Sequence, residues 1–286
     1  MRTYATRLTA VGVLVLVSGV LVGSAGAGPI TIADGNSWAR VWPYAGEDAQ
    51  GMDIWVVNQP DGTDLNVLQQ QWFWYRVDRA TTGGGEKPLE ALDTEPFVFP
   101  SDTDGNGQDD NLYLRYESLD EGLTVEVNYR LMGGTAGSGR ADITESIRII
   151  NMADTAQTVH FFQYSDFILS FNEDTVVIPW PNTARQWFDA VRMSETVVTP
   201  VPAGSEVALV LDLLDELNDD APTTLTGFGG PLTGNASWAF QWDMALEPGG
   251  SFLISKDKSI TPTPDPATLA LLGLGALGLI ARRRRK

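Results

Sequence analysis

The segment from residue 102 to residue 110 carries a pattern of oxygen ligands that suits a metal ion. It fits D-x-D-x-[DN]-G-x-x-D, in which side-chain oxygens surround a hard cation and a glycine makes the sharp turn. Calcium prefers such oxygen ligands. The predicted calcium ligands are Asp102, Asp104, Asn106, Asp110 and, through its backbone carbonyl, Gln108. A polar hairpin connection that holds no ion is the alternative.

This loop differs from an EF-hand in two respects. Its twelfth position is Tyr113 instead of a bidentate glutamate, and strand-like residues flank it on both sides where an EF-hand has helices. It is more similar to the calcium loops of dockerin and thrombospondin type 3 repeats, although those occur in multiples and this one is single. Calcium is the one cofactor that the sequence predicts.

A second set of residues could stack on a ligand. Trp72 and Trp74 share one face of a predicted strand, about 7 Å apart along it, while Phe73 and Tyr75 share the other. One face must be core. The other is either a second packed layer or an exposed platform for sugar rings, and core is the favoured interpretation for both because aromatic side chains supply so much apolar surface.

Acid–base and nucleophilic chemistry find little support. His160, the single histidine, lies six residues before Asp166, about 20 Å along an extended strand, and no G-x-S-x-G motif accompanies it. A glycosidase needs only two carboxyl groups about 5 to 9.5 Å apart. The carboxylates available by number alone are Asp142, Glu145, Asp166, Glu173, Asp174 and Asp243. Nothing in the sequence brings a particular pair together, so most are expected to be ordinary solvated groups.

The elements that must position these residues are mainly strands. In the segment 123–131 every odd position is apolar and every even one polar, which predicts a half-buried strand. Further strands are expected over 52–57, 67–77, 97–99, 112–117, 142–150, 157–169, 175–180, 194–199, 238–244 and 251–256. Turn residues separate them, which predicts antiparallel sheets and an all-β sandwich. One helix is expected near 206–218, although a strand that runs directly into a shorter helix would give a similar pattern.

Composition excludes several function classes. The chain has 286 residues and no cysteine, so disulfides, cysteine zinc sites and thiol catalysis are excluded. Of its 19 Lys+Arg, two lie within the first 27 residues and five over 282–286, so residues 28–281 hold 12 Lys+Arg against 37 Asp+Glu, a net charge of −25. Such an acidic body argues against nucleic acid as a partner and favours neutral ligands.

The two ends carry signals of export. Residues 1–27 hold Arg2 and Arg7, an apolar run and an A-x-A site, which predicts a secretory signal peptide cleaved by signal peptidase. The sandwich is expected over 28–258 and a Thr/Pro linker over 259–263. Residues 264–286 hold a Pro-x-Pro motif, a short apolar segment predicted as a single transmembrane helix, and a basic cluster. The motif is Pro264, Asp265 and Pro266, and the cluster is Arg282, Arg283, Arg284, Arg285 and Lys286.

This C-terminal order resembles the PEP-CTERM protein-sorting signal of Gram-negative bacteria, with Asp265 where that family usually has Glu. The resemblance implies transient anchoring in the inner membrane, a basic cluster held in the cytoplasm, and processing by an exosortase. A permanent tail anchor is the alternative, although 13 apolar residues make a short span. The middle of the chain is similar to uncharacterised β-rich ectodomains found before this signal, which have no assigned activity.

Together these features predict an exported protein of the cell surface or extracellular matrix. We expect it to be structural or glycan-contacting and non-catalytic, with neutral exopolysaccharide as its ligand. A polysaccharide-active enzyme of the glycoside hydrolase type, working with a carboxylate pair, is the alternative.

Overall fold

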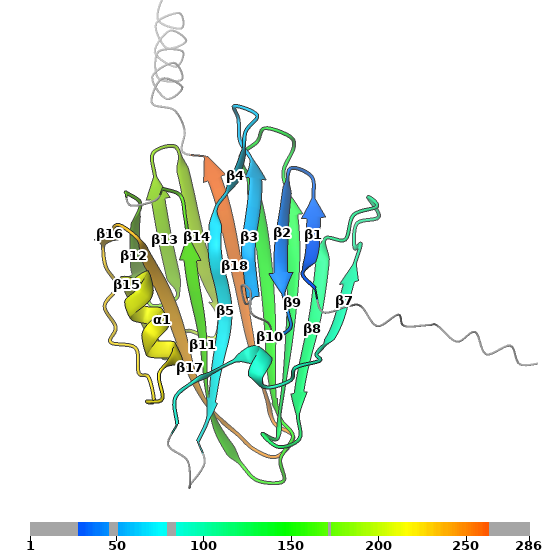
Figure 1. The fold of residues 1–286 in the computed structure, drawn as a ribbon, viewed down its shortest axis with the longest axis vertical. Helices are drawn as coiled ribbons and strands as arrows, with labels where there is room; N and C mark the ends of the chain where they lie inside the picture. The colour runs from blue at the N-terminus through cyan, green and yellow to red at the C-terminus, as the bar shows by residue number, and fades with distance from the viewer. Residues whose placement is uncertain (1–27, 46–50, 79–83, 171–172, 263–286) are drawn as a thin grey trace, which may run out of the picture.

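A computed structural model describes residues 28–45, 51–78, 84–170 and 173–262. Two large antiparallel sheets face one another, and the single α-helix of these described residues lies at one side (Figure 1). The predicted all-β sandwich with one short helix is confirmed. The predicted signal peptide and the apolar tail lie outside the described residues. Among the residues described, no helix has both the length and the apolar character needed to cross a membrane.

The first sheet has the strand order β1-β2-β3-β5-β11-β17-β15, with β4 paired to β3 and β6 to β5. Every pairing is antiparallel, as short turn-linked strands predict. Its strands are β1 (Ile30–Asp34), β2 (Ser37–Trp42), β3 (Gly51–Asn58), β4 (Asp64–Asn66), β5 (Leu68–Val77), β6 (Lys87–Pro88), β11 (Gln157–Phe167), β15 (Gly204–Leu209) and β17 (Ala236–Leu246).

The second sheet has the order β16-β12-β13-β14-β18-β10-β9-β8-β7 and is also antiparallel. Its strands are β7 (Phe97–Ser101), β8 (Asn111–Ser118), β9 (Leu123–Gly133), β10 (Ala141–Asn151), β12 (Thr175–Trp180), β13 (Thr183–Phe188), β14 (Val191–Thr199), β16 (Leu232–Thr233) and β18 (Ser251–Pro262). The alternating segment 123–131 lies within β9, whose odd-numbered residues from Leu123 to Leu131 are buried.

The helical part of the chain is smaller than the predicted 206–218. Strand β15 runs directly into α1 (Val210–Asn218), which packs against β15 and β17, and a 3₁₀ turn, η1 (Leu89–Ala91), follows β6. Leu213 and Leu217 form the buried side of α1. The predicted helix began too early because apolar Val207 fits the helical spacing. In the structure, Val207 is a buried residue of β15.

The predicted linker over 259–263 is corrected by the structure. Strand β18 continues to Pro262, with Ile260 opposite Ala141 of β10 and Met193 of β14. The period-two alternation of buried residues continues through Ile260 and overrides the Thr/Pro composition. The described sandwich therefore ends four residues later than the predicted boundary at 258.

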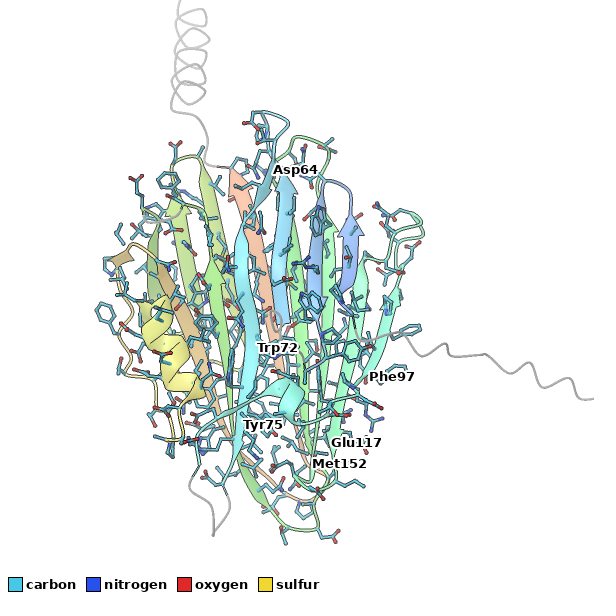
Figure 2. All side chains as sticks on the ribbon, viewed as in Figure 1. Asp64, Trp72, Tyr75, Phe97, Glu117 and Met152 are labelled. Atoms are coloured by element: carbon cyan, nitrogen blue, oxygen red, sulfur yellow. The ribbon has the colours of Figure 1, made fainter. Side chains whose placement is uncertain are left out.

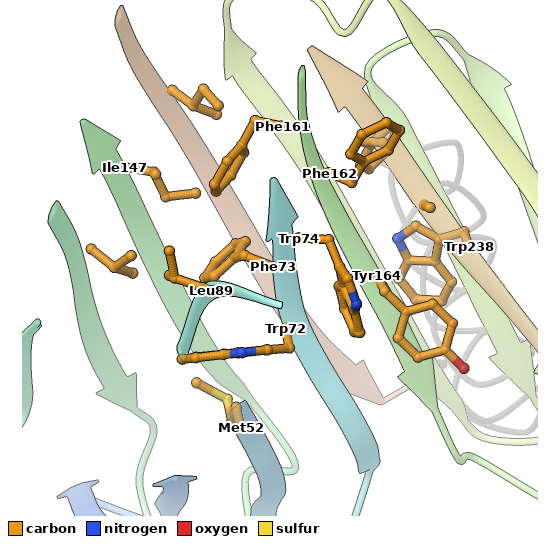
Figure 3. Close-up of a cluster of buried hydrophobic side chains, with 14 of the residues drawn as sticks. Met52, Trp72, Phe73, Trp74, Leu89, Ile147, Phe161, Phe162, Tyr164 and Trp238 are labelled. Carbon is orange, nitrogen blue, oxygen red and sulfur yellow. The ribbon is translucent and has the colours of Figure 1, made fainter. Parts of the chain in front are cut away.

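The core between the sheets is rich in aromatic rings (Figure 3). Phe73 of β5 stacks on Phe161 of β11, with ring centroids 5.5 Å apart, and Phe167 stacks on Trp238 at 5.3 Å. Burial of such side chains removes large apolar areas from water and supplies most of the stabilisation that a chain without disulfides requires.

Candidate functional site

The outer face of β12, β13 and β14 carries a hollow of about 590 Å³. Along β13, Ala184 and Gln186 are buried, while Arg185 and Trp187 alternate with them and are exposed. The period of two therefore places an indole and a guanidinium together on the outer face. The lining includes Val177, Pro179, Arg185, Trp187, Arg192 and Thr261.

A second hollow of about 310 Å³ adjoins the first, because Pro179 lines both. Trp180, at the end of β12, lines this second hollow. Trp180 is 53% exposed and Trp187 is 40% exposed, which is unusual in a chain whose other large aromatic residues lie mostly in the core. We call the two adjoining hollows, the second of which is also lined by residues 202–205, Gly227 and Gly229, the β12–β14 groove.

The β12–β14 groove is positively charged on an acidic protein. Arg185 places its guanidinium 4.8 Å from the ring centroid of Trp180, a cation–π contact. Within the described chain, neither Arg185 nor Arg192 forms an ion pair with a carboxylate. No aspartate or glutamate is among the lining residues of either hollow.

This set of groups suits binding better than catalysis. Exposed indole faces stack on flat apolar surfaces, and guanidinium groups form paired hydrogen bonds with carboxylates. Acid–base hydrolysis of a glycosidic bond needs two carboxyl groups at the ligand, and the lining of the groove supplies none.

The sequence did not single out this groove. Strand β13 was absent from the predicted strands, and Trp180 ends a strand whose aromatic content is otherwise low. The available signal was the alternation of Arg185 and Trp187 with Ala184 and Gln186, which is only four residues long.

The tryptophans that the sequence offered for stacking, Trp72 and Trp74, lie in the core and are 0% and 1% exposed. Figure 2 shows Trp72 about midway along β5, close to η1. The Trp72 indole nitrogen donates to Glu90 Oε2 of η1 at 2.6 Å, and that of Trp74 donates to Asn218 Oδ1 at the end of α1 at 3.0 Å. The face that they share is thus a second packed layer, which corrects the alternative of an exposed platform.

The loop over 102–110 forms a network of hydrogen bonds with itself. Asp102 accepts from the backbone amides of Gly105 and Gly107, at 2.7 and 2.8 Å, and Gly107 has the positive φ of +88° that a sharp turn requires. These two hydrogen bonds lower the pKa of Asp102 below its ordinary value. Asp110 accepts from the amide and the hydroxyl of Thr103.

The remaining predicted ligands of this loop also have partners. Asn106 bridges Asp104 and Asp34, at 3.1 and 3.0 Å, and its Oδ1 accepts from the amide of Gln108. No group of three or more potential metal-ligating His, Cys, Asp or Glu residues occurs in the described parts of the chain. Calcium binding by the loop therefore stays a prediction.

His160 pairs with different carboxylates from the one considered in the sequence. Its Nδ1 lies 2.6 Å from Asp243 Oδ1 and its Nε2 lies 3.2 Å from Asp78 Oδ2, so both ring nitrogens have acidic partners. Asp166 is not a partner of His160. It is buried, as is Asp174, and burial followed by the charge of Asp174 raises the pKa of Asp166. The acidic partners of His160 therefore come from the two strands beside β11: Asp243 lies on β17, and Asp78 directly follows β5.

The other carboxylates considered for catalysis do not converge on the groove. Glu145 lies between the sheets beside Lys256 and Lys258. Asp142 is half-buried opposite Ser259 on β18, and burial raises its pKa. Glu173 is exposed.

Comparison with known proteins identifies the C-terminal segment. Residues 262–286 match the PEP-CTERM protein-sorting motif. The chain carries a PEP-CTERM sorting signal. That signal directs export and sorting to the cell surface, and an exosortase is its processing partner. The Pro-x-Pro motif and the basic cluster of this PEP-CTERM signal lie outside the described residues. No curated protein matches the chain.

The sandwich is similar in fold to part of a larger solved structure. A bacterial glucoamylase complexed with acarbose matches with a TM-score of 0.51 and 8% identity, covering 85% of this chain and 32% of that one. A GalM/aldose epimerase homologue from C. elegans matches with a TM-score of 0.49 and 10% identity, over 82% of this chain and 99% of that one. The chain spans about a third of the length of the glucoamylase. These similarities concern the fold alone.

Proposed function

We propose that this PEP-CTERM protein is a non-catalytic polysaccharide-binding protein of the bacterial cell surface, and that the β12–β14 groove is its binding site. The observation that carries the proposal is the pairing of exposed Trp180 and Trp187 with Arg185 and Arg192, in a groove whose lining lacks carboxylates. Two adjoining hollows suit consecutive sugar rings of an extended polymer.

The charge of the groove decides which polysaccharide we propose. The acidic composition predicts a neutral ligand, but the groove itself presents two arginines without carboxylate partners among the described residues. Guanidinium groups bind carboxylates in a bidentate manner. The proposed ligand is therefore a polysaccharide that contains uronic acids, with its ring faces on the indoles and its carboxylates on the arginines.

The same lining favours binding over hydrolysis. A retaining or inverting glycosidase would need a proton donor and a second carboxylate near the scissile bond. Of the carboxylates that the sequence offered, Glu145 is buried beside two lysines and Asp243 pairs with His160, and none of them lines the groove. We therefore do not favour the glycoside hydrolase alternative.

The test is affinity electrophoresis of the full chain through gels that contain polysaccharide. Gels would hold the uronate-containing fraction of the host's extracellular polysaccharide, a neutral glucan, or no polymer. We expect retardation by the uronate polymer and little by the glucan. Equal migration in all three gels, or release of new reducing ends from the polymer, would contradict the proposal.

A further inference from the structure

Four charged side chains lie inside the sandwich on the inner face of the second sheet. Lys256 and Lys258 lie two residues apart on the buried face of β18. Glu145 of β10 lies opposite Lys256, and Glu195 of β14 lies opposite Lys258. All four side chains are at most 1% exposed. Lys256 Nζ lies 2.5 Å from Glu145 Oε2 and 3.5 Å from Glu195 Oε1, and Lys258 Nζ contacts Glu145 Oε1. Removing these ions from water is costly, so their retention asks for an explanation beyond packing.

An amide from the opposite sheet completes the cluster. Gln163 of β11 is fully buried, and its Oε1 contacts Lys256 Nζ. Its Nε2 donates to Glu195 Oε1 at 2.6 Å and to Ser165 Oγ at 2.9 Å. Glu195 therefore lies within reach of both the lysine nitrogen and the amide nitrogen. An amine, a carboxamide and a carboxyl group therefore meet at one point.

The surroundings favour a nucleophilic amine. The ring centroid of Phe73 lies 5.1 Å from Lys256 Nζ, and the Trp238 indole nitrogen donates to Glu195 Oε2 at 2.8 Å. Burial lowers the pKa of Lys256 to about 8, although the charge of Glu195 opposes this shift. A lysine is nucleophilic only when its amine is neutral, and fixed proximity raises the effective concentration of the reacting groups.

We propose that Lys256 Nζ and Gln163 Cδ join in an intramolecular isopeptide bond, with Glu195 as the proton carrier. The Lys256 ammonium first gives one proton to Glu195. The neutral amine then attacks Cδ of Gln163, and the bond from Cδ to Nε2 breaks. Glu195 protonates the departing Gln163 Nε2, which leaves as ammonia. Glu195 then takes a second proton from the attacking nitrogen of Lys256. No oxidation occurs, no co-reactant is needed, and Glu195 ends protonated beside the Lys258–Glu145 pair.

This bond would connect the two sheets covalently. It links β11 of the first sheet to β18 of the second, the strand that precedes the PEP-CTERM signal. The chain has no cysteine, so it has no disulfide to serve this purpose. A cross-link between positions distant in sequence stabilises mainly by restricting the unfolded chain. The proposal is independent of the polysaccharide groove on the outer face.

Peptide mapping of the full chain tests the bond directly. The purified protein is denatured, digested with a protease and analysed by mass spectrometry. We expect one linked pair of peptides containing Gln163 and Lys256, lighter than the sum of the two by one ammonia, about 17 Da. Recovery of both peptides as separate, unmodified species from folded protein would overturn the proposal. So would a link from Lys258 to Glu145 with loss of water.

Two variants test the assigned roles. Glu195→Gln removes the proton carrier while it preserves the shape of the side chain, and we expect the linked pair to disappear from protein that retains its near-ultraviolet circular dichroism. Ser255→Ala is the matched control, since Ser255 lies on the opposite face of β18 from Lys256 and its loss leaves the amine, the amide and the carboxyl group in place. Its linked pair should persist. A link at unchanged yield in Glu195→Gln would contradict the role of Glu195. The map of the unmodified chain decides the bond itself if a variant does not fold.

Discussion

The Arg185 guanidinium lies 4.8 Å from the ring centroid of Trp180, which ends the neighbouring strand β12. This contact holds a cation and an indole together at the junction of two hollows. Trp187, two residues after Arg185, has no such cation over its ring in the described structure and remains 40% exposed. One indole of the groove is therefore paired and the other is open to a ligand.

The charge of the groove predicts how binding depends on salt. We expect binding of the uronate-containing polysaccharide to weaken as NaCl rises, because exposed charges are screened within about 10 Å at 0.1 M ionic strength. Arg192→Gln should reduce both the affinity and the dependence on salt. Affinity electrophoresis at several NaCl concentrations measures this, with Arg148→Gln on β10 as a control remote from the groove. If binding by Arg192→Gln and by the unmodified chain depended on salt equally, the role of this arginine would be contradicted.

Asp166 predicts a dependence of stability on pH. Its side chain is buried, its Oδ1 lacks a hydrogen-bond partner in the described structure, and burial followed by the charge of Asp174 raises its pKa to about 7. Between the ordinary pKa of 3.8 and this value, the folded protein keeps a proton that the unfolded chain has lost. The free energy of unfolding therefore falls as pH rises through this window, and the loss is complete above about pH 7.

Asp166→Asn should remove this loss. Urea unfolding at pH 5 and pH 8 should show that the variant lacks a decrease of roughly 2–4 kcal/mol that the unmodified chain shows between these values. Asp154→Asn, at an exposed position, is the control and should keep the decrease. If Asp166→Asn and the unmodified chain respond to pH equally, Asp166 does not carry the effect.

Calcium binding by the loop over 102–110 gives a third prediction. Millimolar Ca²⁺ should raise the melting temperature of the full chain, in proportion to RT ln(1 + [L]/Kd). Asp104→Ala should abolish the rise, and Asp154→Ala should retain it. Scanning calorimetry with Ca²⁺ and with EDTA measures both. A melting temperature that Ca²⁺ leaves unchanged would show that the hydrogen bonds of Asp102 to Gly105 and Gly107 hold the loop without an ion.

Period-two alternation predicted most of the strands, but it could not assign the surfaces. It placed Trp72 and Trp74 on one face correctly. It could not predict that this face is buried, because η1 and α1 cover it only through tertiary packing. Lys256 and Lys258 share the buried face of β18 with Ile254 and Ile260. Cross-strand pairing with Glu145 and Glu195, which the pattern of one strand does not reveal, accounts for their burial. The groove escaped prediction because its lining residues come from several separate segments of the chain, each of which contributes only a few of them.

Processing of the PEP-CTERM signal gives a fourth prediction. In cells that contain the matching exosortase, the exported protein should lack the apolar segment and the basic cluster that ends at Lys286. Mass spectrometry of the C-terminal peptide measures this, and cells without the exosortase serve as the control. Recovery of the intact C-terminus from exosortase-containing cells would show that the tail is retained as an anchor.

The central claim is that the β12–β14 groove binds polysaccharide through Trp187, and isothermal titration of the full chain with a uronate-containing oligosaccharide tests it most directly. Trp187→Ala removes the open indole from a strand whose inward residues are unchanged, so the fold should persist. We predict that the Kd rises roughly tenfold or more, about 1.4 kcal/mol. Phe97→Ala, which removes an aromatic side chain that is 56% exposed on the edge strand β7, should leave the Kd unchanged. A Kd that is the same in Trp187→Ala and in the unmodified chain would contradict the account.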